Sequence, residues 1–84
     1  MSVRVRIVEL VGWYGVLAIL AAFAMNSFAI LSSQSFAYQL LNLTGALGII
    51  ISSLAKKDYQ PVFLNVIWMI VAVVVLIKLA IGVV

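Results

Sequence analysis

The chain has 84 residues, of which 68% are hydrophobic and 8% are charged, and its formal net charge is +3. These side chains provide too little polar surface for a soluble domain of this size, so the composition excludes that class and indicates a membrane protein. The chain has no histidine or cysteine, and Glu9 and Asp58 are its only side-chain carboxylates. We therefore expect no enzyme activity, no metal and no cofactor, and the unpatterned positive charge predicts no binding of nucleic acid.

The first apolar stretch, residues 7–31, is predicted to be a membrane helix, because about 20 apolar residues cross a hydrocarbon core about 30 Å thick. A cleavable secretory signal is the alternative, since Arg4 and Arg6 precede the stretch and the run Ala22-Phe23-Ala24 resembles a cleavage site. Because the chain begins with Met1, we expect the segment to be retained. Wound at about 100° per residue, the helix carries its small and polar residues on one face: Gly12, Gly15, Ile19, Ala22, Asn26 and Ala29.

The second apolar stretch, residues 36–54, follows a predicted loop at 32–35 and is also predicted to be a membrane helix. Its face of small and polar residues consists of Tyr38, Asn42, Gly45, Ile49 and Ser52. The opposite face is aliphatic and is expected to contact lipid: Leu40, Leu43, Leu47, Ile50 and Leu54. A second loop, residues 55–60, contains Lys56 and Lys57.

The third apolar stretch, residues 61–81, begins with the only proline of the chain. Pro61 suits the first turn of a helix, where its missing N–H would have no partner, and Asp58 is the expected N-cap. Large aliphatic residues form one face, and the predicted inward face carries Pro61, Asn65, Trp68, Met69 and Ala72. We expect the ring of Trp68 to pack in the protein core rather than to form a stacking surface for a solute.

These stretches predict an all-α membrane fold, with one domain over residues 1–84 that is a bundle of three transmembrane helices. Three crossings place the amino terminus and the Lys56-Lys57 loop on one side of the membrane and Lys78 near the other. Because basic residues favour the cytoplasmic side, the side with the amino terminus is predicted to be cytoplasmic. Trp13 and Tyr14 are expected in the aromatic belt at the membrane interface.

Each predicted helix carries one asparagine on its inward face: Asn26, Asn42 and Asn65. Amides that bond between membrane helices contribute about 0.6 to 2 kcal/mol apiece, so our first interpretation is that the asparagines hold helices together. Small residues on the same faces are then packing positions: Gly15, Ala22, Gly45, Ser52 and Ala72. The alternative is that Asn65, Asn42 and Trp68 line a path for a solute, since polar groups inside a membrane often mark one.

The run from Tyr38 to Leu79 resembles a family of small, uncharacterised three-helix membrane proteins of bacteria, and it is similar in outline to the SemiSWEET and PQ-loop transporters. The shared features are Gly45 in the second helix, Pro61 after a short loop, and Asn65 one turn into the third helix. The resemblance implies a three-helix protomer of the bacterial inner membrane that pairs into a parallel homodimer. It also implies that a substrate lies between the two units and that Asn65 contributes to the sugar site.

Two features of those transporters are absent from this chain. Met25-Asn26-Ser27 stands where they carry a proline and glutamine pair, and Ile49 stands at about the place of their second-helix tryptophan. We therefore expect a structural or accessory subunit that assembles through its small-residue and asparagine-bearing faces, with a facilitative transporter of small solutes as the alternative. Because a lone chain would leave some amides toward lipid, we expect a partner in the bilayer, either a second copy in a homodimer or a larger membrane complex.

Overall fold

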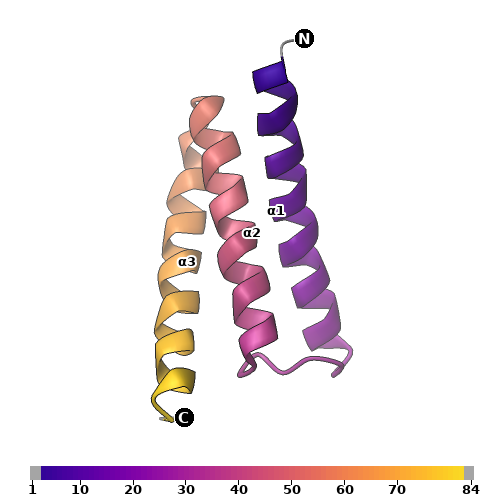
Figure 1. Ribbon diagram of the computed structural model, residues 1–84, viewed down its shortest axis with the longest axis vertical. Coiled ribbons are helices and arrows are strands. Elements are labelled where there is room, and N and C mark those ends of the chain that lie inside the picture. The colour runs from indigo at the N-terminus through magenta and orange to yellow at the C-terminus, as the bar shows by residue number, and fades with distance from the viewer. Residues whose placement is uncertain (1–2, 83–84) are drawn as a thin grey trace.

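The computed structural model describes residues 3–82 as three helices in series (Figure 1). The helices are α1 (Val3–Ser27), α2 (Phe36–Ala55) and α3 (Tyr59–Ala80). With 25, 20 and 22 residues, they extend over about 30 to 38 Å at about 1.5 Å per residue. All three are long and apolar enough to cross a membrane. The start of α1 and the α2–α3 loop lie at one end of the molecule, and the α1–α2 loop lies at the other (Figure 1).

The bounds of α1 differ from the predicted range of 7–31, because the helix begins at Val3 and stops at Ser27. Its end is a Schellman turn, in which Ile30 N–H donates to Met25 O at 2.8 Å and Ala29 N–H donates to Asn26 O at 3.1 Å. Ala29 adopts a left-handed backbone with φ of 59°. The apolar residues 28–31 are therefore not helical, and Ala29, expected on the inward face of the helix, is exposed in the turn.

The connection from α2 to α3, residues 56–58, is shorter than the connection from α1 to α2, residues 28–35. Lys57 has φ of 56° and closes a second Schellman turn, in which Asp58 N–H donates to Ser53 O at 2.9 Å. Asp58 is the N-cap residue of α3, but its side chain does not make the expected capping hydrogen bond. α3 begins at Tyr59, two residues before the predicted start, so Pro61 still lies in its first turn.

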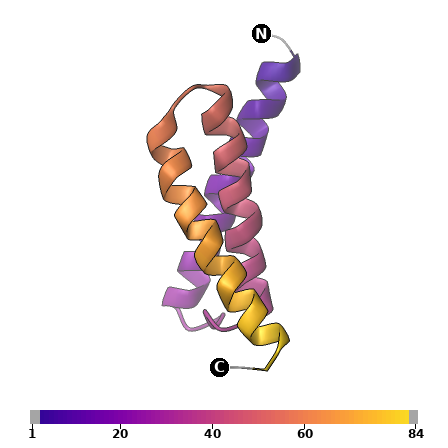
Figure 2. The same ribbon diagram turned by 90° about the vertical axis from the view of Figure 1, so that its left-hand side faces the viewer.

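The helices form an open layer with α2 in the middle, as Figures 1 and 2 show from two directions. α2 packs against α1 and against α3, whereas no Cα of α1 lies within 8 Å of a Cα of α3 in the described residues. Because α2 has neighbours on two sides, it is buried over a wider arc than one inward face. Ile50, predicted to contact lipid, is only 8% exposed for this reason, whereas Leu47 on the same predicted face is 47% exposed.

Glycines bring α1 and α2 into close contact. A Cβ on Gly45 would lie 2.8 Å from Ile19 Cγ1 and 3.0 Å from the backbone oxygen of Gly15. A Cβ on Gly48 would lie 2.8 Å from the backbone oxygen of Val11. Side chains at these positions would therefore push the two backbones apart, which places the predicted packing positions Gly15 and Gly45 at the α1–α2 interface.

Other small residues fill the rest of the helix contacts. Ala22 in α1 is 0% exposed and Ala72 in α3 is 2% exposed. Ser52 lies against Gly12, where an added Cβ would be 2.8 Å from the Ser52 Cβ. Ala18, which the sequence pattern did not single out, is 6% exposed.

A hydrogen bond between side chains adds to the α1–α2 interface. The hydroxyls of Tyr14 and Thr44 lie 2.7 Å apart. The Tyr14 hydroxyl thus forms a hydrogen bond with α2. This contact was not expected from the predicted place of Tyr14 in the aromatic belt at the membrane interface.

Candidate functional site

A groove lies between α1 and α3, and α2 forms its floor. At the end near the α2–α3 loop it widens into a pocket of about 430 Å³. Toward the α1–α2 loop it widens into a second pocket of about 420 Å³. Val16 and Ile49 line both pockets. The two pockets therefore belong to one groove, which we call the α1–α3 groove. The groove exists because α1 and α3 each pack on α2 and not on one another.

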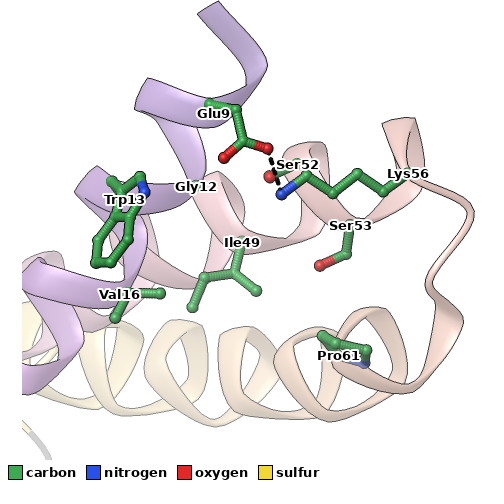
Figure 3. Close-up of a pocket in the computed structure, with 9 residues that line it drawn as sticks. All are labelled: Glu9, Gly12, Trp13, Val16, Ile49, Ser52, Ser53, Lys56 and Pro61. Carbon is green, nitrogen blue, oxygen red and sulfur yellow. Dashed lines mark ion pairs between the residues drawn. The ribbon is translucent and has the colours of Figure 1, made fainter. Parts of the chain in front are cut away.

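An ion pair stands at the end of the groove near the α2–α3 loop. Lys56 Nζ lies 2.6 Å from Glu9 Oε1, and the two side chains are 50% and 39% exposed. The pair joins α1 to the end of α2 (Figure 3). At this exposure it stabilises the fold by only about 0 to 1 kcal/mol, so the two charges remain available to other ligands.

Two serine residues lie beside the ion pair on α2. Ser52 and Ser53 line the pocket and are 5% and 8% exposed. In the part of the chain that the structure describes, neither hydroxyl has a hydrogen-bond partner. Every side-chain oxygen or nitrogen that is fully enclosed there does have a partner. The two hydroxyl oxygens are therefore not fully enclosed, and both are accessible from the pocket. Figure 3 shows them on the same side of α2 as Ile49, facing α1 and Pro61 of α3. We call Glu9, Lys56, Ser52 and Ser53 the polar end of the groove.

The other end of the groove contains two of the predicted solute-binding residues. Trp68 Nε1 donates to Asn42 Oδ1 at 3.0 Å, and Asn42 Nδ2 donates to Tyr38 O at 2.9 Å. Asn42 is 3% exposed, so α2 and α3 are joined by a hydrogen bond whose acceptor is buried. The first interpretation of the asparagines, a bond between helices, describes Asn42.

Trp68 is not the packed core ring that we expected. It is 47% exposed, because α1 does not extend over α3 to cover it. Its ring lines the second pocket and also a smaller pocket of about 150 Å³ between α2 and α3. The indole N–H is therefore fixed by α2 while part of the ring remains open to the groove.

Asn65 occupies a different place from Asn42 and Trp68. It is 7% exposed, and its Nδ2 donates to Pro61 O at 2.8 Å, one turn back in the same helix. It lines none of the three pockets described above. The three predicted solute-binding residues are thus not one cluster: the structure brings Asn42 and Trp68 together and leaves Asn65 apart.

Asn26 binds the loop after α1 rather than another helix. Its Nδ2 donates to Leu31 O at 3.0 Å. Gln39 holds the same loop from α2, since its Nε2 donates to Ser33 O at 2.6 Å and the residue is 6% exposed. The sequence reasoning missed Gln39, although it lies three residues before Asn42 and thus near the same face of the helix.

A single chain buries two of its three helix asparagines by itself. Asn42 and Asn65 are 3% and 7% exposed without any second chain. These two amides are therefore covered without a partner chain, contrary to the expectation that a lone chain would leave some amides toward lipid. The α1–α3 groove, in contrast, is open in the single chain.

Residues 8–82 match one protein family, which is uncharacterised. No curated protein and no solved structure matches the chain. The similarity to SemiSWEET and PQ-loop transporters is not supported by such a match and stays a hypothesis.

Proposed function

The chain belongs to this uncharacterised family, and we propose that the protein is an accessory or assembly subunit in a membrane. Because the family has no assigned activity, the proposal rests on the geometry. In this proposal the three helices cross the bilayer, and the α1–α3 groove takes up another component of the membrane. The observation that carries the proposal is the separation of α1 from α3, which leaves the groove open along both helices.

The outer surface supports a place inside a bilayer. Large apolar side chains point outward on every helix, among them Leu17 at 57%, Leu47 at 47% and Ile70 at 55% exposed. In water such a surface would cause aggregation, whereas acyl chains solvate it. Arg4, Arg6 and the Lys56-Lys57 loop share one end, which by the positive-inside tendency faces the cytoplasm of a bacterial inner membrane.

The groove is the contact site in this proposal because the other association surfaces are already used. The glycines of α1 and α2 contact each other, and the buried amide of Asn42 is bonded to Trp68. A partner that bound through these groups would have to open the protomer. A partner that enters the groove needs no such change.

Site-specific photo-crosslinking in native membranes tests this proposal. A benzophenone amino acid at Val16 lies in the groove, and the same probe at Leu47 is the matched control on the outer face of α2, because the two side chains are 46% and 47% exposed. We expect the adducts at Val16 to share one component and the adducts at Leu47 to be a mixture of lipids. The same adduct pattern at both positions would remove the groove as the contact site.

A facilitative transporter of the SemiSWEET type, working as a homodimer, is the second candidate. Its support is the Asn42–Trp68 pair, whose partly open ring lies in the groove as a stacking surface for a solute would. Uptake of radiolabelled glucose into proteoliposomes separates the two functions. A transporter should show uptake that Trp68→Leu lowers, whereas an accessory subunit should show none with either chain.

A further inference from the structure

The α1–α3 groove changes in polarity along its length. Its polar end carries a carboxylate, an ammonium and two serine hydroxyls that lack hydrogen-bond partners in the described residues. Beyond Val16 and Ile49 its lining is almost entirely apolar: Ile19, Leu20, Phe23, Tyr38, Asn42 and Trp68. Charges at one end and hydrocarbon along the rest is the order of groups in a phospholipid.

The length of the groove agrees with such a ligand. From Glu9 to Phe23, the outermost lining residues of α1, there are 23 − 9 = 14 residues, or about 21 Å at about 1.5 Å per residue. Half of a hydrocarbon core is about 15 Å thick. The groove therefore reaches from the headgroup level past the middle of the membrane, far enough to cover one acyl chain.

We propose that this groove binds a phospholipid with a phosphoethanolamine headgroup. The inference rests on the proposed accessory function and identifies the membrane component that the groove takes up. The ammonium of the headgroup is bound by Glu9. Its phosphate is bound by Lys56 and by the hydroxyls of Ser52 and Ser53. One acyl chain lies along Val16 and Ile49.

Charge complementarity selects a zwitterionic headgroup over an anionic one. Glu9 and Lys56 contribute opposite charges to the same pocket, and no other charged residue among those that the structure describes lines it. An anionic headgroup gains Lys56 but faces the carboxylate of Glu9. Phosphoethanolamine offers one charge to each. Its ammonium also donates hydrogen bonds, which the trimethylated nitrogen of phosphocholine cannot do.

A transmembrane helix fits the groove less well than a lipid. The pockets of the groove have about 430 and 420 Å³. Volumes of this size are typical of small-molecule sites. An apolar helix would also leave the serine hydroxyls without partners, which is costly once they are buried.

Native mass spectrometry of the purified full chain tests the proposal. The chain is mixed with equal amounts of phosphatidylethanolamine and phosphatidylglycerol that carry the same acyl chains. At partly exposed charges we expect a preference of about threefold for phosphatidylethanolamine. Glu9→Gln should abolish the preference, and Lys56→Gln should weaken binding of both lipids about threefold. Lys57→Gln is the matched control, because it removes a charge at the same end but does not line the pocket, and it should keep the preference.

A second variant covers the case in which loss of the ion pair disturbs folding. Ser53→Ala keeps Glu9 and Lys56 and should lower binding of both lipids about twofold with their ratio unchanged. Circular dichroism of each variant checks that the helices are intact. Free phosphoethanolamine at the same concentration should not displace the lipid, because it lacks the acyl chain that the groove covers.

Three outcomes would overturn the proposal. Equal binding of the two lipids that Glu9→Gln leaves unchanged would remove the headgroup assignment. Phosphatidylcholine binding as tightly as phosphatidylethanolamine would remove the hydrogen-bonded ammonium. If the Val16 photo-probe instead captures a second copy of the chain, the lipid is not the occupant, while the accessory function stands. A Val16 pattern identical to that of Leu47 would remove both.

Discussion

The close approach of α1 and α2 predicts that Gly48→Ala destabilises the protein, although alanine is the better helix former. At an open helix position the substitution would gain about 1 kcal/mol in helix propensity. At this position the added Cβ would lie 2.8 Å from the backbone oxygen of Val11 and 3.4 Å from the Cα of Gly15. A backbone oxygen cannot rotate away as a side chain does, so α1 has to move away from α2.

The size of the effect follows from this geometry. Ordinary contacts between carbon and oxygen begin at about 3.3 Å, so the helices must separate by about 0.5 Å. Overpacking of this kind costs about 1 to 3 kcal/mol. After the gain in propensity we expect a net loss of about 1 kcal/mol in the free energy of unfolding. The loss is larger if the 2.7 Å bond between Tyr14 and Thr44 breaks as well.

The assay is unfolding of the purified protein in mixed micelles with increasing sodium dodecyl sulfate, followed by circular dichroism. Gly48→Val should cost more than Gly48→Ala, because its side chain is larger at the same contact. Leu47→Ala, on the neighbouring outward position, is the control and should stay within about 0.5 kcal/mol of the wild-type chain. A Gly48→Ala protein as stable as the wild type, or more stable, would refute the reasoning about the α1–α2 contact.

The remaining predictions use the same unfolding assay except the last. Trp68→Phe removes the donor to the buried Asn42 Oδ1 and should lower the free energy of unfolding by about 1 to 3 kcal/mol. Trp13→Phe is the control, since no described residue forms a hydrogen bond with the Trp13 indole. A similar loss for Trp13→Phe would contradict the role of the Trp68–Asn42 bond. Ala29→Gly should stabilise the protein by about 0.5 to 1 kcal/mol, because glycine adopts the left-handed φ of 59° without strain. Ala21→Gly inside α1 is the control and should destabilise the protein. If both substitutions changed the stability in the same direction, the prediction would be wrong. Gln39→Leu removes the bond to Ser33 O and should speed hydrogen exchange of loop amides 32–35 roughly tenfold, and unchanged exchange would count against it.

The three helices could be predicted from the sequence because each apolar stretch is long enough to cross a membrane. The end of α1 could not be, because the turn that stops it carries Ala29 at the left-handed position where glycine is the usual signal. The middle position of α2 was also missed. Each helix was assigned one inward face, although Gly48 and Ser53 lie outside the predicted face of α2 and are buried.

The candidate site was predicted only in part, since helical periodicity shows which way a side chain points but not what it meets. Asn42 and Trp68 were both placed inward, and they bond each other. Asn65 was placed inward by the same rule, but it bonds its own helix through Pro61 O. The polar end of the groove was not predicted, because Glu9 and Lys56 are 47 positions apart and only the packing of α1 on α2 brings them together.

The middle position of α2 also sets the order in which the chain can fold during synthesis. The contacts between α1 and α2 involve neighbours in the chain, so this hairpin can form while α3 is still on the ribosome. Until α3 enters, the side-chain oxygen Oδ1 of Asn42 lacks the donor that Trp68 later supplies. A hydrogen-bond acceptor without a partner is costly in hydrocarbon, so this oxygen favours the binding of a donor. The α1–α2 hairpin therefore already favours the side of α2 against which α3 packs.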